Sequence, residues 1–223
     1  MIELAQRPDF AIGSADAIKA LAKKDRATLL VISDSHGRAD VFKAIVEKFG
    51  ERCDALVFCG DGIGDLCSVL EATKKNKKLC KAFPPVAAFA RGNGDYPEFP
   101  FGDGEIKVPL HQLLKVAGMS VLVTHGHAEG VYYGLGRLNQ EALENQADAV
   151  FYGHTHIAVT KEEDCTYFIN PGSCSHPRGS QKACFAIVQI PGMQERIQTT
   201  FFSVGLSLDG WAFAPYTPAL MGW

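Results

Sequence analysis

Histidine and aspartate side chains of this chain occur in short clusters whose spacing suits metal binding. Two clusters have the form His-x-His and a third has the form Asp-x-His; their members are Asp34, His36, His125, His127, His154 and His156. In an extended segment, residues two apart point to the same side, so each cluster can direct two ligands at one point. A single histidine is more often an ordinary core or surface residue than a ligand. Three such clusters in one chain favour a metal site.

Each candidate ligand follows a short apolar run, which is the element expected to position it. The runs 28–33, 55–60, 86–92, 120–124 and 149–153 lead into Asp34, Asp61, Asn93, His125 and His154. Continuous apolar runs of this length are typical of strands buried on both faces of an α/β sheet. The ligands follow one another at intervals of about 30 residues, the length of one strand–crossover–strand unit. Because such sheets place their sites beyond the carboxyl ends of strands, we expect these side chains to meet.

Helices and further strands are expected between and after these runs. Apolar residues at helical spacing predict helices over 39–49 and 132–146, and Ser14 can cap a third helix that runs to Lys24. The segment 96–104 is dense in proline and glycine and is expected to be a loop. Strand-like runs then occupy 105–109, 110–116, 157–163, 166–170, 183–190 and 198–204. The predicted fold is α/β (α+β), with two stacked mixed β-sheets flanked by helices.

Composition excludes several classes of protein. The 223 residues are 47% hydrophobic and 21% charged, as is ordinary for a globular chain. The net charge of -3 argues against a nucleic-acid-binding protein that relies on a basic surface. No apolar run reaches the roughly 18 residues of a membrane span, and Arg7 and Asp9 interrupt any signal-like start. We expect one domain over 1–223, with an N-terminal extension over 1–26 and an aromatic C-terminal tail over 205–223.

The seven cysteines indicate no site of their own. They are odd in number and none forms a C-x-x-C pair, so zinc-ribbon and thioredoxin-like motifs are not supported. Most lie in or beside apolar runs, as Cys59 does, where free cysteine behaves as a small buried hydrophobe. Reduced, structural cysteines are typical of the cytosol, so a cytoplasmic location is expected.

The motifs occur in an order and at a spacing that resemble a known family. They are D-S-H-G at 34–37, G-D at 60–61, G-N-G-D at 92–95, T-H-G-H at 124–127, G-H-T-H at 153–156 and I-N-P-G-S at 169–173, with Pro177 and Arg178 after the last. Together they resemble the calcineurin-like metallophosphoesterase superfamily over roughly 28–190, and its small single-domain bacterial phosphodiesterase branch in particular. That branch also contains the retromer scaffold subunit. The resemblance implies a four-layer αββα sandwich.

A centre of two divalent metal ions is what the resemblance implies for the site. Asp34, His36 and His156 would ligate the first ion; Asn93, His125 and His154 would ligate the second; Asp61 would bridge the two. Oxygen and imidazole ligands without a thiolate suit Mn, with Fe, Ni or Zn as alternatives. Two ions of this kind lower the pKa of a bridging water, so that hydroxide attacks a phosphate ester.

Three further residues are candidates for a part in catalysis. Many family members carry a histidine where this chain has Gly94, and His127, two residues from His125, is the nearest substitute for contacting phosphate or donating a proton. Asp95 can orient a ligating histidine or cap a turn. Arg178 can reach a substrate phosphate or pair with an acidic neighbour. His111 and His176 have no partner at useful spacing and stay unassigned.

The expected function is metal-dependent hydrolysis of a small phosphodiester or phosphomonoester. One alternative is a non-catalytic scaffold like the retromer subunit, whose hallmark would be lost ligands. A second is a nuclease of the same superfamily, although no large nucleic acid or membrane partner is expected. The C-terminal tail carries Trp211, Phe213, Tyr216 and Trp223 and is a possible contact between copies of the chain, or else it packs back on its own domain.

Overall fold

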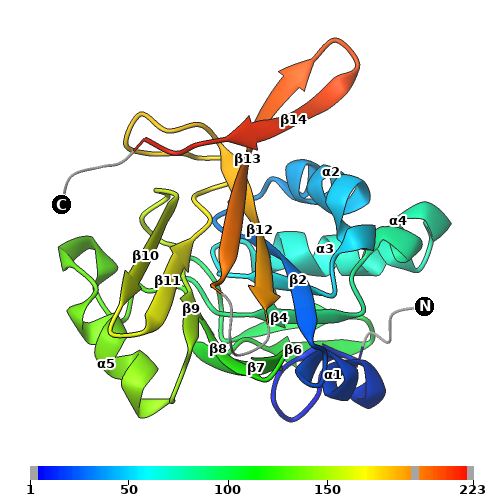
Figure 1. Cartoon of the computed structure of the whole chain (residues 1–223). Helices are drawn as coiled ribbons and strands as arrows, with labels where there is room; N and C mark the ends of the chain where they lie inside the picture. The colour runs from blue at the N-terminus through cyan, green and yellow to red at the C-terminus, as the bar shows by residue number, and fades with distance from the viewer. Residues whose placement is uncertain (1–4, 192–195, 220–223) are drawn as a thin grey trace.

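Two β-sheets run through the middle of the molecule (Figure 1). The computed structural model describes residues 5–191 and 196–219. The larger sheet has the strand order β1-β4-β3-β2-β12-β13-β14, with the bounds β1 (Ile12–Gly13), β2 (Arg26–Ile32), β3 (Ala55–Phe58), β4 (Val86–Phe89), β12 (Cys184–Pro191), β13 (Gln198–Ser207) and β14 (Gly210–Tyr216). The smaller sheet has the order β10-β11-β9-β8-β7, with the bounds β7 (His111–Val116), β8 (Met119–Thr124), β9 (Ala149–Phe151), β10 (Val159–Glu163) and β11 (Thr166–Asn170).

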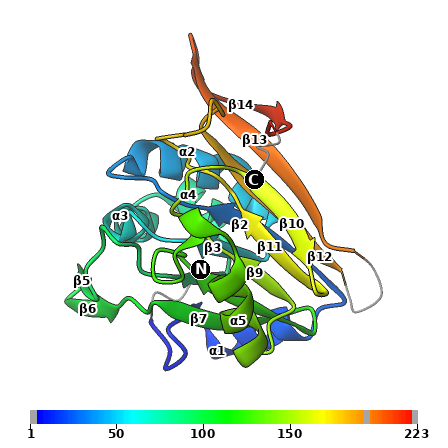
Figure 2. The same cartoon turned by 90° about the vertical axis from the view of Figure 1, so that its left-hand side faces the viewer.

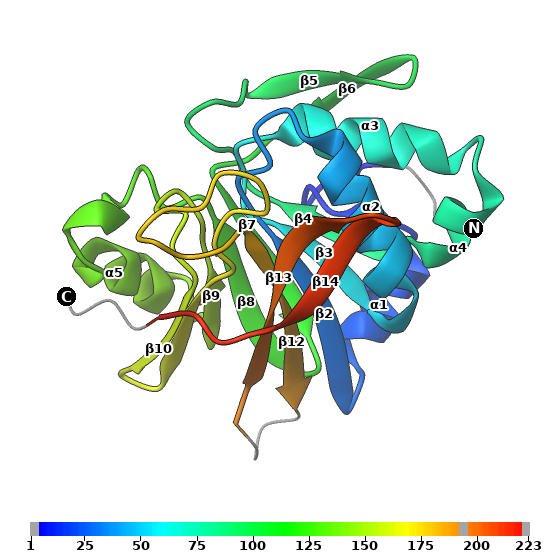
Figure 3. The ribbon, with the colours of Figure 1, turned by 90° about the horizontal axis from the view of Figure 1, so that it is seen from above.

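Helices cover the outer face of each sheet, and Figure 3 shows the two groups on opposite sides. The helices are α1 (Ala15–Ala22), α2 (Ala39–Phe49), α3 (Ile63–Thr73), α4 (Lys77–Ala82) and α5 (Gly136–Glu144), with 3-10 turns η1 (Gly50–Arg52) and η2 (Val131–Tyr133). α2, α3 and α4 pack on the larger sheet, and α5 packs on the smaller one. α1 packs instead against the core between the sheets, next to β7. The layer order is helices, sheet, sheet, helix. The predicted αββα sandwich is therefore confirmed.

Successive residues of a buried strand face different cores, which explains the continuous apolar runs. Val31 of β2 lies in the core between the sheets with Val123 of β8. Its neighbour Leu30 lies under the helices with Phe42 of α2. Because side chains alternate across a strand, both faces must be apolar when both are covered.

Parallel pairing brings the carboxyl ends of the ligand-bearing strands to shared edges. In the larger sheet, β2 pairs parallel with β3 and β3 with β4. In the smaller sheet, β8 pairs parallel with β9 and β9 with β11. β12 and β13 run antiparallel to their neighbours, so the larger sheet is mixed, as predicted. The segments that follow β2 and β3 therefore leave the same edge of the larger sheet, and those that follow β8 and β9 leave the same edge of the smaller sheet.

The prediction of a loop over 96–104 is wrong in part. Strand β5 (Glu98–Phe101) forms a hairpin with β6 (Gly104–Lys107). Phe99 and Phe101 pack partly buried against the helical core, and the backbone N–H of Gly102 donates to Glu71 of α3 at 2.8 Å. The two phenylalanines provide a buried face that outweighs the turn-forming residues, and a two-stranded hairpin tolerates proline.

The predicted helix over 132–146 is also divided. η2 ends at Tyr133 and α5 begins at Gly136, with Gly134 between them at a φ of 119°. A helix cannot continue through that backbone angle. The N-terminal helix is confirmed, because the hydroxyl of Ser14 accepts from the N–H of Ala17.

The aromatic C-terminal segment forms a strand. β14 pairs antiparallel with β13, and Figures 1 and 2 show the turn between them projecting beyond α2. Trp211 and Phe213 pack partly buried on the helical side, where the rings of Phe49 and Phe213 are 5.5 Å apart. Tyr216 packs on the core between the sheets. Trp223 lies outside the described residues, and association of two copies through this segment stays a prediction.

None of the helices in the described ranges combines the length and the apolar character that a membrane span requires.

Candidate metal centre

The loops that carry the candidate ligands have an unusual backbone. Asp34, His36, Asp61, His154 and His156 all adopt positive φ angles, between 46° and 67°. Residues other than glycine enter this left-handed region at a cost of roughly 1–3 kcal/mol each, and such residues gather at functional sites. The surrounding structure therefore holds these five residues in a backbone conformation that residues other than glycine disfavour.

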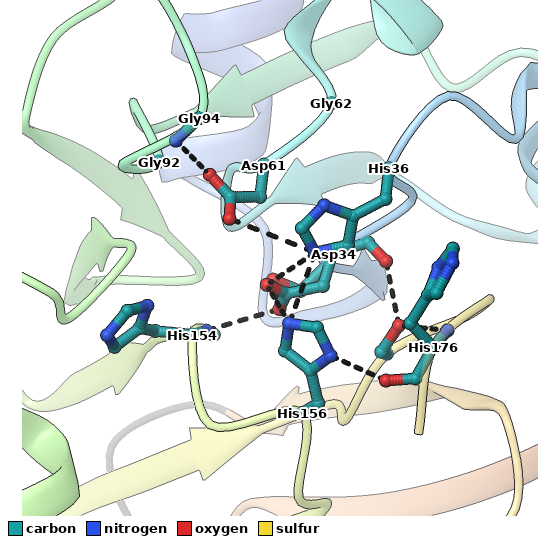
Figure 4. A network of polar contacts seen from close by, with 12 residues as sticks. Asp34, His36, Asp61, Gly62, Gly92, Gly94, His154, His156 and His176 are labelled. Carbon is teal, nitrogen blue, oxygen red and sulfur yellow. Dashed lines mark hydrogen bonds and ion pairs between the residues drawn. The ribbon is translucent and has the colours of Figure 1, made fainter. Parts of the chain in front are cut away.

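One group of ligand atoms comes from the ends of β2 and β9 (Figure 4). The Nε2 atoms of His36 and His156 are 3.1 Å apart. Asp34 Oδ1 lies 3.1 Å from His156 Nε2 and 3.7 Å from His36 Nε2. Three possible metal-ligand atoms, from two segments 120 residues apart in sequence, thus lie close together.

A second group shares Asp34 and adds residues from β3 and β8. His125 Nε2 lies 3.5 Å from Asp61 Oδ2 and 3.9 Å from Asp34 Oδ1. Asp61 Oδ2 also lies 3.8 Å from His36 Nε2, so this carboxylate stands between the two groups. The two groups of candidate ligand atoms are therefore adjacent and share Asp34.

The buried atoms fit a cation. Asp34 Oδ1 and His125 Nε2 are buried and have no hydrogen-bond partner among the described residues. The other oxygen of Asp34 is held by the hydroxyl of Ser33 at 2.6 Å and by the N–H of His154 at 3.2 Å. Ligand atoms about 2.1 Å from one ion and at right angles to each other are about 3.0 Å apart, close to the separations here. One oxygen is therefore fixed by the protein while the other is left for a metal.

Backbone carbonyls orient two of the histidines. His125 Nδ1 lies 2.6 Å from the carbonyl oxygen of Cys59, and His156 Nδ1 lies 2.5 Å from that of His176. A carbonyl can only accept, so each Nδ1 donates and each Nε2 keeps a lone pair for the centre. This second contact is typical of metal-ligating histidine.

The pKa shifts of most candidate ligands favour the protonation states that bind a cation. Burial alone would raise the pKa of Asp61, but contact with His125 and a hydrogen bond from the N–H of Gly94 lower it to about 2. Burial lowers the pKa of His36, and burial together with His125 lowers the pKa of His154 to about 4. Burial opposes but does not prevent a raised pKa at His125, because Asp61 and Asp34 face it. Ionised carboxylate and neutral imidazole are the forms that bind metals.

Two predicted ligands lie outside these close groups. Asn93 is exposed in the turn after β4. The His154 backbone contacts Asp34, but Figure 4 shows its ring on the side away from His36 and His156. That ring packs instead near His125, with centroids 5.0 Å apart. Ligation by Asn93 and His154 stays a prediction.

Asp95 holds the loop that carries Asp61. Its carboxylate accepts from the backbone N–H groups of Asp61, Gly62, Ile63 and Gly92, at 2.8–2.9 Å. These contacts are those expected of the turn-capping alternative, and the orientation of a histidine by Asp95 stays a prediction. A carboxylate is needed because four N–H groups converge on it, three of them at the start of α3.

His127 and Arg178 border the centre without touching a carboxylate among the described residues. His127 Nδ1 is buried without a hydrogen-bond partner there, and its ring is 5.4 Å from that of His125. Arg178 donates through Nη1 to the hydroxyl of Tyr132 and through its backbone N–H to the carbonyl of His156 at 3.2 Å. The alternative of an acidic partner for Arg178 finds no support among the described residues, and phosphate contact by either residue stays a prediction.

Sequence reasoning missed several residues that support the centre. Asp65 accepts from the hydroxyl of Ser35 at 2.6 Å and from the N–H of Gly37 at 2.9 Å, which fixes the loop after β2. The ring of His176 lies 5.3 Å from that of His36. These contacts join segments that are distant in sequence, so no local pattern could have found them.

Known proteins resemble the chain over most of its length. The family model for the calcineurin-like phosphoesterase superfamily domain matches residues 28–193. The Bacillus subtilis protein described as “Probable metallophosphoesterase YsnB” is 32% identical over 162 residues, covering 73% of this chain and 83% of that protein. Phosphodiesterase YfcE of Escherichia coli K12 is 30% identical over 172 residues, covering 72% of this chain and 86% of that protein.

Solved structures share the architecture at lower identity. A predicted phosphoesterase from Streptococcus pneumoniae has a TM-score of 0.62 at 22% identity, and the match covers 86% of this chain and 99% of that one. Vacuolar Protein Sorting 29 from Cryptosporidium parvum has a TM-score of 0.61 at 16% identity, with 86% of this chain and 98% of that one covered. At these identities the likeness concerns the fold alone.

Proposed function

This chain belongs to the calcineurin-like phosphoesterase superfamily, and we propose that it is a metal-dependent phosphodiesterase that acts on a small phosphate ester. The observation that carries the proposal is the pair of buried atoms Asp34 Oδ1 and His125 Nε2, which have no hydrogen-bond partner among the described residues and belong to the two groups of candidate ligand atoms. A purely structural role would leave such atoms paired, because an unsatisfied buried polar group costs roughly 1–3 kcal/mol.

We propose a centre of two ions, held by Asp34, His36 and His156 on one side and by Asp61 and His125 on the other, with Asn93 and His154 completing the second position. Divalent ions at such a centre supply a nucleophilic water at neutral pH and neutralise charge on phosphoryl oxygens. Mn is the first candidate, and Fe, Ni and Zn suit the same donors.

The role of the chain's own residues is to hold and orient. Asp95 fixes the backbone of Asp61, and the carbonyls of Cys59 and His176 fix two imidazoles. No serine or cysteine nucleophile is required. Cys59 in particular is fully buried, and burial raises the pKa of its thiol well above the ordinary value, so it stays protonated.

We further propose that the substrate is small and that the chain works in the cytosol. A net charge of -3 offers no general attraction for a nucleic-acid backbone. The seven cysteines have no paired spacing, as is typical of proteins kept reduced.

Hydrolysis of bis-p-nitrophenyl phosphate tests the proposal. The purified chain is assayed with Mn, Ni, Zn or Mg, beside Asp61→Asn and the exposed control Asp209→Asn. We expect metal-dependent release of p-nitrophenolate by the wild type and by Asp209→Asn, and a rate at least about 100-fold lower in Asp61→Asn.

Elemental analysis separates the alternatives. About two transition-metal ions per chain together with turnover support the enzyme. A chain that binds no metal, or an equal rate in Asp61→Asn, would refute it and favour a scaffold. Faster cleavage of a single-stranded oligonucleotide than of small diesters would favour a nuclease.

A further inference from the structure

Tyr132 borders the candidate centre on the side of His154. Its hydroxyl donates to the backbone carbonyl of His154 at 2.9 Å. Its ring meets the imidazole of His154 edge-on, with centroids 4.8 Å apart. The residue is 40% exposed, so it belongs to the rim of the centre and not to the core.

The guanidinium of Arg178 lies against this tyrosine. Nη1 donates to the hydroxyl of Tyr132, and the guanidinium carbon is 5.9 Å from the centroid of the ring. The backbone N–H of Arg178 donates to the carbonyl of His156. Arg178 is thus attached to the loop 153–156 at two points, directly at His156 through its backbone and through Tyr132 at His154.

None of the carboxylates in the described part of the chain is paired with the guanidinium of Arg178. Within 5–191 and 196–219, its guanidinium contacts a phenol and no carboxylate. Arg38 differs, because both oxygens of Asp40 accept from its guanidinium at 2.9 Å. A guanidinium has five N–H donors in a planar fork, and Tyr132 takes one of them. The remaining donors suit the paired oxygens of a phosphoryl group.

We propose that Tyr132 is a positioning residue, which holds Arg178 at the rim so that the guanidinium binds the phosphoryl oxygens of the substrate. The proposal rests on the proposed function, since it requires a phosphate ester. A phenol suits the task because it fixes the guanidinium without cancelling its charge, as a carboxylate would. Holding the long side chain before the substrate arrives also lowers the entropy lost on binding.

Kinetics and phosphate binding of single and double variants test the pair. The variants are Tyr132→Phe, Arg178→Ala and their combination, with Tyr133→Phe as control. Tyr133 is the neighbouring phenol, is 98% exposed and takes part in no described contact with the centre. The measurements are KM and kcat for bis-p-nitrophenyl phosphate in saturating Mn, and the Kd of inorganic phosphate by calorimetry. Thermal unfolding checks that each variant folds.

We expect Arg178→Ala to raise KM and the phosphate Kd about tenfold or more, because a charge-assisted contact is lost. Tyr132→Phe keeps the ring and loses the hydroxyl, so both constants rise about three- to tenfold while kcat changes less. In the double variant, loss of the hydroxyl adds nothing to the effect of Arg178→Ala. Tyr133→Phe keeps wild-type values.

Two results would overturn the inference. Unchanged KM and phosphate Kd in Arg178→Ala would show that the guanidinium does not meet the phosphoryl group. An equal effect of Tyr132→Phe with and without Arg178 would show that Tyr132 acts through His154 alone. If the wild type binds phosphate through Arg178 but hydrolyses no ester, the proposed function fails and the positioning role stands.

Discussion

Removal of His111 is predicted to destabilise the protein, because it leaves a buried carboxylate without its partner. His111 at the start of β7 lies between two glutamates. Its Nε2 is 2.6 Å from Glu129 Oε1, and its Nδ1 is 3.2 Å from Glu141 Oε1 of α5. The side chain of Glu129 is only 6% exposed, and its other oxygen accepts from the hydroxyl of Thr124 at 3.3 Å.

The magnitude follows from this burial. Breaking a buried ion pair by removing one partner costs about 3–5 kcal/mol. The side chain of His111 is 30% exposed, so water reaches part of the pair and the expected loss is nearer to 2–3 kcal/mol. For a chain of this length each kcal/mol shifts the unfolding midpoint by roughly 2–4 °C. His111→Ala should therefore unfold roughly 5–10 °C below the wild type.

The loss should also depend on pH. The hydrogen bond to Glu129 raises the pKa of His111 above its ordinary 6.5. Burial would raise the pKa of Glu129, but the hydrogen bond from His111 lowers it below 4.5. The histidine contribution is complete below pH 6.5 and is lost as pH rises through the folded pKa. The glutamate contribution is complete above pH 4.5 and is lost as pH falls.

Urea unfolding of the wild type and His111→Ala between pH 5 and pH 9 measures the effect. The difference in unfolding free energy should be greatest near pH 5–6 and should shrink towards pH 9. Metal is held constant, so that titration of the candidate ligands cancels between the two proteins. Glu129→Gln in the His111→Ala background should cost little further, because it removes the uncompensated charge. A difference below about 0.5 kcal/mol, or one that grows with rising pH, would refute the reasoning.

Two further predictions concern the centre itself. Gly92→Ala should lower bound metal and activity at least about tenfold, because an added Cβ would lie 2.0 Å from Asp61 Oδ1; metal analysis and the assay above check this. Gly104→Ala is the matched control, since its Cβ would meet nothing within 4 Å, and equal losses in both variants would contradict the argument. Removal of metal by a chelator should lower the unfolding midpoint by roughly 5–10 °C, because an ion at 100 times its Kd adds about 2.7 kcal/mol. An unchanged midpoint in differential scanning fluorimetry would contradict metal binding to the folded chain.

Much of the fold could be predicted because its signals are local. The runs before Asp34, Asp61, His125 and His154 correspond to β2, β3, β8 and β9, and each boundary agrees within two residues. Strands buried on both faces need apolar residues at every position, and that demand is visible in a short stretch of sequence. The loop prediction over 96–104 failed because Phe99 and Phe101 pack against the apolar core that includes α3.

Among the candidate site residues, too, some could be predicted from local sequence and others could not. Asp34, His36 and His156 were found by residue type and spacing, and the structure brings their ligand atoms together. For Asp95 the sequence left two roles open, the orientation of a histidine and the capping of a turn, since nothing in G-N-G-D reveals that its carboxylate accepts from the amides of another loop.

The sequence by itself determined which side chains could bind metal and which strands carry them, because residue type and hydrophobic period are properties of neighbours along the chain. Only the tertiary structure decided how those side chains are oriented and what surrounds them. The Tyr132–Arg178 contact spans 46 residues and the His111–Glu129 pair spans 18. Such contacts depend on how sheets, loops and helices pack, and the packing follows from the summed burial of the whole core, which no short segment of sequence contains.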